Sequence, residues 1–349
     1  MSRRTGSRRT ITLLVAGIGV VAAALVAALV PVPYVILSPG PTLNTLGKTS
    51  SGPLITIAGH RTYPTSGHLN LVTVSFLGGP GNGFNVFTAV RAWLTPHTAV
   101  VPESEIFPPN QSEQQVVQQD TAEMNNSQQT AQAAALCTLG IRFTTLNTVT
   151  QTEKGLPAAG VLHPGDSITA VDGTPVTCNH DTGTLVRTHP AGSVVTLTIL
   201  RKGKIGHVRL KTASLQGHSV IGVVVAESYT QFPFKINFKV GDIGGPSAGM
   251  MFALGIVDKL TPRNLTGGRF IAGTGEISAN GAVSAIGGIQ QKMAGARAAG
   301  ATIFLTPAAN CSDTTGAVPA GLRLVKVATL RQAINDLTAI KAGRSVPGC

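Results

Sequence analysis

The sequence contains few charged and few aromatic residues for its length, and it lacks the motifs of several enzyme classes. Of its 349 residues, 12% are charged and 4% are aromatic. Its eight histidines are scattered, and neither HExxH nor CxxC occurs, so we predict no metal site. A nucleotide-binding P-loop is excluded as well, because Thr42 stands five positions before Gly47, where that motif requires glycine. The sequence therefore predicts no cofactor.

The chain is basic, but it has no basic run interleaved with aromatic residues. The formal net charge is +12. Four of these charges come from arginines near the N-terminus, namely Arg3, Arg4, Arg8 and Arg9. The rest of the chain therefore has a net charge of 12 − 4 = +8. A diffusely basic surface of this kind does not predict nucleic-acid binding.

One long hydrophobic run lies near the N-terminus. Residues Ile11 to Val30 are twenty residues without a charge, which is enough to span the hydrocarbon core of a bilayer. The arginines before the run predict a cytoplasmic N-terminus. A cleaved signal peptide is the alternative, but its apolar core is usually shorter, and no clear Ala-x-Ala site closes this run. We expect a single-pass anchor in the cell membrane, with the catalytic part outside the cytoplasm.

The four cysteines are compatible with an oxidising compartment. They allow three complete pairings. We favour Cys311 with Cys349, because both belong to the C-terminal half and their bond would hold the tail beside the loop after Thr306. Cys137 with Cys178 then follows by elimination. Four reduced, buried cysteines are the alternative.

The most informative segment is Gly244-Gly245-Pro246-Ser247-Ala248-Gly249. The apolar run from Ser247 to Asp258 predicts a buried helix. Ser247 then lies at or near a helix N-terminus, where unpaired N–H groups can stabilise an oxyanion. A serine N-cap after a glycine–proline turn is the structural alternative.

Lys292 follows forty-five residues after Ser247, among small and apolar neighbours. A serine hydroxyl is a poor nucleophile without a base. A lysine can act as that base only when it is neutral, and burial favours the neutral form by lowering the pKa of the amine. The two residues together predict a Ser–Lys hydrolase.

These segments resemble the proteolytic domain of the Lon family of Ser–Lys proteases, in its ATPase-lacking, membrane-anchored, PDZ-containing branch. The family pattern Gly-Pro-Ser-Ala-Gly is matched by Gly245 to Gly249. The pattern around the lysine is matched by Thr274-Gly275-Glu276-Ile277, Gly281, Gly287-Gly288 and Lys292. The resemblance is close from Phe234 to about Leu337.

The resemblance implies a role for each matched residue. Ser247 is the nucleophile, Lys292 is its base, and the Thr274 hydroxyl holds the lysine amine. Gly245 and Pro246 support the turn before the serine. Leu305-Thr306-Pro307 and Asn310 fall where the family has its next strand and an asparagine-containing loop. The family also implies a homo-oligomer, a six-membered ring.

One position departs from the wider family pattern. Many Lon proteases carry an acidic residue three positions before the serine, where this chain has Gly244. The nearest acid, Asp242, is five positions before it. The Gly-Gly-Pro-Ser segment found here resembles the corresponding segment of the PDZ-containing branch. We therefore interpret the departure as a subfamily trait.

Residues from about Gly140 to Thr212 have a different pattern. Short alternating strands separated by Pro-Gly and Asp-Gly turns are typical of a small β-rich domain. The string from Pro157 to Gly173 resembles the PDZ domains of bacterial proteases, and Gly192 to Lys211 predicts its closing hairpin. The resemblance implies peptide binding by strand addition, with a carboxylate-binding loop near Leu139-Gly140-Ile141. A structural insert without a ligand is the alternative.

The predicted fold is an α/β (α+β) Lon-type proteolytic domain with an inserted β-rich PDZ-like domain and an N-terminal transmembrane helix. His68 to Val74 predicts a strand and Asn125 to Leu136 a helix, and the Pro- and Gln-rich segment Val100 to Gln119 predicts a loop or a partly ordered arm. We expect a cytoplasmic basic tail over 1–10 and the anchor over 11–34. The Lon-like domain then covers 35–140 and 216–349, and the PDZ-like domain 141–215.

The predicted function is that of a membrane-anchored, ATP-independent serine endopeptidase acting on extracytoplasmic proteins or peptides. Its PDZ domain would engage substrates or tune their access. One alternative is a PDZ binding scaffold with a weakly active or inactive protease-like domain. Another is a non-proteolytic acyl-transfer enzyme with the same chemistry. The presence of Ser247, Thr274 and Lys292 at the family's spacing argues against an inactive scaffold.

Overall fold

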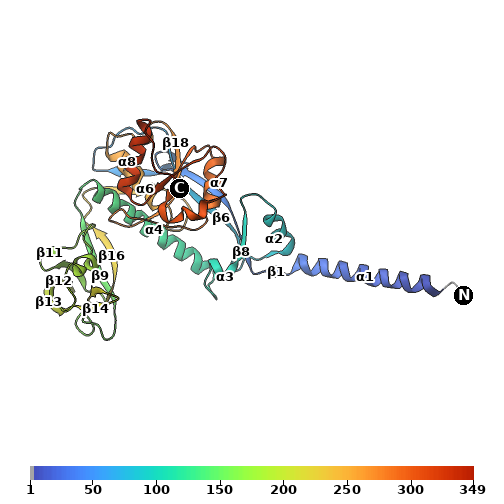
Figure 1. Cartoon of the computed structure of the whole chain (residues 1–349), viewed down its shortest axis with the longest axis horizontal. Helices are drawn as coiled ribbons and strands as arrows, with labels where there is room; N and C mark the ends of the chain where they lie inside the picture. Colours follow the sequence, from blue (N-terminus) through green and yellow to red (C-terminus); the bar gives the residue numbers. More distant parts are fainter. Residues whose placement is uncertain (1–3) are drawn as a thin grey trace.

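The computed structural model describes residues 4–349, with side chains from Arg9 onward (Figure 1). Arg3 and the side chains of Arg4 and Arg8 from the predicted basic tail therefore lie outside the described part. Helix α1, Arg4–Leu29, projects from the rest of the chain. Its segment from Arg9 to Leu29 is long and apolar enough to cross a membrane, and none of it is buried against the protein.

The larger domain is built on a six-stranded mixed sheet in the order β22-β21-β18-β6-β2-β8. The four neighbouring strands β22, β21, β18 and β6 run parallel, whereas β2 pairs antiparallel with both β6 and β8. Three of the strands precede the PDZ-like segment, namely β2 (Tyr34–Asn44), β6 (His68–Gly78) and β8 (Ala99–Pro102). The other three follow it, namely β18 (Phe270–Gly273), β21 (Ile303–Pro307) and β22 (Arg323–Val327). A single sheet thus takes strands from both sides of the PDZ-like segment.

Helices cover both faces of this sheet. On one face, α4 (Glu113–Thr138), α6 (Gly249–Leu260) and α8 (Leu330–Lys341) share a core with alternate residues of β6, β18, β21 and β22. On the other face, α7 (Ile289–Ala298) packs against the intervening residues of β6, β18 and β21. The sheet therefore separates α6, which follows Ser247, from α7, which carries Lys292.

Helix α4 begins twelve residues before the helix that the sequence predicted. Ser112 and Gln115 form a capping box at its start, in which the Ser112 N–H donates to Gln115 Oε1 at 2.8 Å. The prediction of a loop over Val100 to Gln119 is therefore wrong at both ends. The segment contains β8, the short helix α3 (Glu103–Ile106) and the first turns of α4. Its many glutamines, which suggested an irregular arm, are good helix formers on an exposed face.

Smaller elements complete the larger domain. Short antiparallel pairs join β1 (Pro31–Val32) to β7 (Phe84–Asn85), β3 (Lys48–Thr49) to β4 (Gly52–Pro53), β5 (Ile55–Ala58) to β17 (Lys235–Phe238), and β19 (Glu276–Ile277) to β20 (Val283–Ser284). The remaining helices are α2 (Val86–Trp93) and the 3₁₀ turns η1 (Ala308–Asn310) and η2 (Ser312–Thr314).

The PDZ-like domain has its own sheet, in the order β13-β12-β10-β9-β16, with β11 paired to β10. Its elements are β9 (Thr144–Thr152), β10 (Ser167–Val171), β11 (Thr174–Pro175), α5 (Thr182–Arg187), β12 (Val194–Arg201), β13 (Lys204–Lys211), the hairpin β14 (Ala213–Leu215) and β15 (His218–Val220), and β16 (Val223–Thr230). β12 and β13 form the predicted closing hairpin. β16 lies beyond the predicted boundary at residue 215, yet it pairs along the whole of β9.

Candidate active site

Ser247 lies in the loop between β17 and α6, one residue before the Ala248 cap of that helix. The preceding turn needs glycine twice. Gly245 has a φ of +83°, which side chains rarely adopt. A Cβ at Gly244 would come within 2.6 Å of the Asp120 Cβ, so the residue that departs from the wider family pattern makes room for an acid from α4.

Helix α4 holds this loop by two hydrogen bonds. The Gly245 N–H donates to the Asp120 carbonyl at 3.1 Å, and Ser127 Oγ donates to the Pro246 carbonyl at 2.9 Å. Sequence reasoning missed Asp120 and Ser127, because both lie more than a hundred residues before Ser247 and belong to no local motif.

Lys292 lies in the first turn of α7, and its side chain is 4% exposed. Its Nζ donates to Ser247 Oγ at 2.9 Å and to Thr274 Oγ1 at 3.4 Å. Burial lowers the pKa of Lys292 to about 8, because the ammonium loses its hydration inside the protein. The amine is therefore placed to exchange a proton with the Ser247 hydroxyl near neutral pH.

Thr274 and Gly275, at the end of β18, hold the Ser247 backbone. Thr274 Oγ1 donates to the Ser247 carbonyl at 3.0 Å, and the Gly275 N–H donates to the same oxygen at 2.8 Å. The N–H of Met250, in the first turn of α6, returns a bond to the Gly275 carbonyl at 2.9 Å. These bonds fix the serine relative to the sheet.

The N–H groups near Ser247 are not all available to an oxyanion. The N–H groups of Gly249 and Met250 already donate to Pro246 and Gly275. Within the described residues, the N–H groups of Ser247 and Ala248 make no hydrogen bond. These two are the candidate oxyanion donors.

Asn310 holds the segment that leads to Lys292. The Ile286 N–H donates to Asn310 Oδ1 at 2.9 Å, and Asn310 Nδ2 donates to the Ile286 carbonyl at 3.0 Å. The side chain is buried. Asn310 therefore positions the loop before α7 and does not reach Ser247 itself.

Ser247 and Lys292 open into a cleft of about 680 Å³ with an acidic lining. Among the described residues that line the cleft, Lys292 is the only basic side chain, whereas five carboxylates are present: Glu105, Asp120, Glu123, Asp242 and Glu276. Burial and the nearby Glu123 charge raise the pKa of Asp120. The cleft is thus locally acidic in a chain whose net charge is +12.

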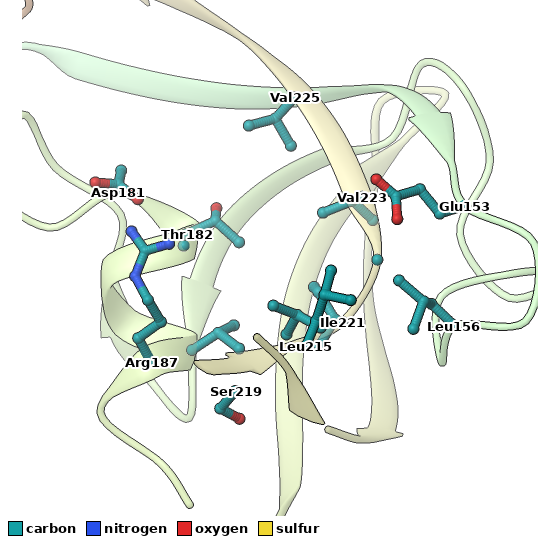
Figure 2. Close-up of a pocket in the computed structure, with 14 residues that line it drawn as sticks. Glu153, Leu156, Asp181, Thr182, Arg187, Leu215, Ser219, Ile221, Val223 and Val225 are labelled. Carbon is teal, nitrogen blue, oxygen red and sulfur yellow. The ribbon is translucent and has the colours of Figure 1, made fainter. Parts of the chain in front are cut away.

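A second cavity, of about 260 Å³, lies in the PDZ-like domain between α5 and β16 (Figure 2). Arg187 and Asp181 lie on the α5 side, and Val223 and Val225 lie on β16. β16 is the last strand of its sheet in the described chain, so one edge of its backbone has no strand partner there. An extended peptide can pair with such an edge.

The loop before β16 directs backbone donors away from the sheet. The Ile221 and Gly222 carbonyls accept from the N–H groups of Ala158 and Glu153 at 2.8 and 3.0 Å. In a trans peptide the N–H of the next residue points opposite to the carbonyl. The N–H groups of Gly222 and Val223 therefore point away from Ala158 and Glu153.

The predicted carboxylate-binding loop near Leu139-Gly140-Ile141 has a different role. Its three N–H groups donate to the Ala135, Cys137 and Leu136 carbonyls, and so they cap the C-terminus of α4. These N–H groups are therefore not available to a carboxylate, and the cavity lies instead beside β16, the last strand of the sheet in sequence.

Two disulfides are present, and both join the pairs favoured from the sequence. Cys137 at the end of α4 bonds to Cys178 in the PDZ-like domain, and Cys311 after η1 bonds to Cys349. The first ties the PDZ-like domain to the helix that supports the Ser247 loop. The second holds the C-terminus near η1.

Comparisons with known proteins match both parts of the chain. The family profile of the Lon protease C-terminal proteolytic domain matches residues 204–339, and that of the PDZ domain matches residues 137–212. A Lon protease of Clostridioides difficile is 37% identical over 117 residues, which are 31% of this chain and 14% of that protein. A Lon protease of Desulforamulus reducens is 32% identical over 164 residues, which are 44% of this chain and 19% of that protein.

Solved PDZ domains are also similar to part of the chain. The crystal structure of the PDZ domain of an SdrC-like protein from Listeria monocytogenes is 25% identical, with a TM-score of 0.21, and the match covers 23% of this chain and 85% of that one. The chain spans less than a fifth of the length of the two Lon proteases above. On the two family profiles and the Lon relatives, the chain combines a Lon-type proteolytic domain with a PDZ domain behind an N-terminal apolar helix.

Proposed function

We propose that this protein is a membrane-anchored serine endopeptidase with a Ser247–Lys292 dyad. The observation that carries the proposal is the 2.9 Å contact between Lys292 Nζ and Ser247 Oγ, made by a buried lysine whose pKa is lowered to about 8. A neutral lysine can accept the serine proton without the aid of a histidine. Membership of a domain family whose named relatives are proteases supports the same chemistry.

The proposed reaction proceeds in two stages. Ser247 Oγ attacks the peptide carbonyl while Lys292 takes its proton, and the N–H groups of Ser247 and Ala248 donate to the oxyanion. Lys292 then gives the proton to the leaving amine, which leaves an acyl group on Ser247. Water, deprotonated by the same amine, attacks the acyl group, the acid product leaves, and Lys292 returns the proton to Ser247 Oγ. Thr274 holds both partners in place through its single hydroxyl.

Peptide cleavage by the purified full chain tests this proposal. Ser247→Ala and Lys292→Arg should each abolish cleavage, since arginine cannot be a base near neutral pH. Ser284→Ala and Lys326→Met change an exposed serine and an exposed lysine and serve as matched controls that keep activity. Activity retained in Lys292→Arg would refute the dyad. Transfer of the acyl group to an added amine without hydrolysis would favour the acyl-transfer alternative.

The charge of the cleft supports a preference for cationic peptide segments. Five carboxylates face a substrate bound at Ser247, and the only basic lining side chain in the described residues is Lys292, which acts in its neutral form. Field lines concentrate in a cleft lined by charges of one sign, which raises the local concentration of oppositely charged ligands. A lysine or arginine near the scissile bond would fit this lining.

The PDZ cavity supports binding of a peptide tail beside β16. The tail would add as a strand to the free edge of β16, with its carboxylate at the N–H groups of Gly222 and Val223 and an apolar side chain against Val186 on α5. Since β16 leads through β17 to the Ser247 loop, such a ligand could alter access to the dyad. Fluorescence anisotropy with peptides that end in a free or an amidated carboxyl group tests this assignment.

The expected compartment is the outer side of the cell membrane. The apolar helix α1 supports an anchor, the arginines before it support a cytoplasmic N-terminus, and two disulfides support an oxidising environment. The proposed reaction uses no ATP. Protease added to intact spheroplasts should digest the catalytic part, and full protection would refute the orientation. Assembly into a six-membered ring remains an expectation from the family resemblance.

A further inference from the structure

Helix α2 carries an exposed apolar face. Its side chains Phe87, Val90 and Trp93 are 54%, 49% and 75% exposed, and Leu94, which follows the helix, is 72% exposed. The opposite face packs on the protein, where Ala92 joins a small core with Ile36 and Phe84. Large apolar side chains gathered on one face of an amphipathic helix indicate a binding surface.

The position of α2 is fixed to the end of the apolar helix α1. The strand after α1, Pro31–Val32, pairs with Phe84–Asn85, which directly precedes α2. Asn85 caps α2 through the Thr88 N–H, and its Nδ2 donates to the Ala28 carbonyl in the last turn of α1 at 3.1 Å. In Figure 1, α2 lies beside the point where α1 leaves the body of the protein.

We infer that α2 lies in the interface of the same lipid bilayer that α1 spans, with Phe87, Val90, Trp93 and Leu94 inserted among the acyl chains near the headgroups. This inference rests on the proposed anchoring by α1. The β1–β7 pair and the Asn85–Ala28 hydrogen bond hold the start of α2 at the end of α1. Because that end of a membrane-spanning helix lies at the bilayer surface, α2 lies at the same depth. Short amphipathic helices bind at that depth through their apolar face, and tryptophan is enriched there.

The occupant is the bilayer and not a protein partner, because the β1–β7 pair and the bond from Asn85 to Ala28 hold α2 beside the end of the membrane-spanning segment. The surface is mainly apolar, and Arg91 is the one charged side chain within α2. Binding should therefore not require anionic lipids. The contact would set the orientation of the larger domain relative to the membrane. β7 pairs with β1, and α2 packs against β2 of the central sheet through Ala92 and Ile36.

The sequence contains one tryptophan, so fluorescence excited above the absorption band of tyrosine reports on Trp93 alone. The experiment reconstitutes the full chain into vesicles of phosphatidylcholine, with or without phosphatidylglycerol, and replaces part of the lipid by analogues brominated near the headgroup end of the acyl chains. We expect Trp93 emission to be blue-shifted, quenched by the brominated lipids in both compositions, and protected from iodide in the water.

A matched control moves the reporter to a distant exposed site. In a Trp93→Phe background, Ile205→Trp places the tryptophan on the β12–β13 hairpin, where Ile205 is 76% exposed. That tryptophan should be quenched by iodide and not by brominated lipid.

The possible results separate this inference from the anchor on which it rests. A chain that floats with the vesicles but keeps a water-exposed, iodide-quenched Trp93 would overturn the inference and leave the anchor intact. A chain that does not float would overturn both. Protection of Trp93 from both quenchers, together with cross-linking through α2, would show that another protein or a second copy covers this face, and would also overturn the inference.

Discussion

The low pKa of Lys292 makes a quantitative prediction for activity. With a pKa of about 8, roughly one tenth of the enzyme has the neutral amine at pH 7 and roughly nine tenths at pH 9. Since only the neutral form can take the Ser247 proton, kcat/KM should rise about tenfold over this range and level off above it. Initial rates with a fluorogenic peptide between pH 6 and pH 10 measure the profile. A rate that is highest at acidic pH would refute the reasoning.

The same shift makes a prediction for folding stability. The difference between the ordinary lysine pKa of 10.5 and the folded value of about 8 corresponds to about 3 kcal/mol. Between these pH values the unfolded chain binds more protons than the folded one, so the contribution of Lys292 to stability rises with pH through this window. Below pH 8 the burial cost is present in full, and above about pH 10.5 it has vanished.

Replacement of the lysine isolates this contribution. Lys292→Met removes the titrating amine but keeps a similar volume, so its stability should lack the rise of about 3 kcal/mol between pH 8 and pH 10.5. Urea denaturation at the two pH values, with Lys326→Met as the control that keeps the rise, measures the difference between variant and parent. The difference between variant and parent removes the contributions that other titrating groups make to the pH dependence of stability. Lys259 is one such group, because burial also lowers its pKa. An identical pH dependence in Lys292→Met and the parent would show that Lys292 is charged without cost.

Four further results follow from the contacts described above. Thr274→Val removes the donor to the Ser247 carbonyl and should lower kcat about tenfold with little change in KM, which corresponds to about 1–2 kcal/mol. An unchanged kcat would show that Thr274 does not position the catalytic residues. Asp120→Asn should weaken the preference for peptides with lysine or arginine near the scissile bond, measured as a ratio of kcat/KM values for matched cationic and neutral peptides. Val186→Asp should abolish peptide binding in the PDZ cavity while cleavage of short peptides persists, and unchanged anisotropy would place the binding site elsewhere. Cys349→Ser opens a disulfide that closes a separation of 38 residues and should reduce stability by about 4 kcal/mol, read as a lower Tm.

The parts of the site that share a local motif could be predicted from the sequence. Ser247 is predicted from its own neighbours, because a glycine–proline turn precedes it and an apolar run follows it. Lys292 is likewise predicted from the small residues around it. The structure brings the two side chains within 2.9 Å, and Thr274, named from the same motif, lies 3.4 Å from Lys292 Nζ. The helix after the serine was predicted over residues 247–258 and spans Gly249–Leu260.

The supporting contacts could not be predicted, because they join distant segments. Asp120 and Ser127 approach the Ser247 loop only when α4 packs across α6. The pairing of β16 with β9 is also long-range, and it moves the candidate peptide groove from Leu139-Gly140-Ile141 to the loop before β16. Neither relation leaves a periodic signal in a single sequence. The strand β16, which pairs with β9 in the PDZ-like sheet, follows both the closing hairpin and the predicted boundary at residue 215.

The central claim is that Ser247 is a nucleophile activated by neutral Lys292. Labelling of the full chain with a fluorophosphonate, followed by mass spectrometry of its peptides, tests this claim directly. The label should be found on Ser247, its rate should rise through about pH 8, and Lys292→Met should be labelled far more slowly with its fold intact. A label on another residue, or equal labelling of Lys292→Met and the parent, would contradict the claim.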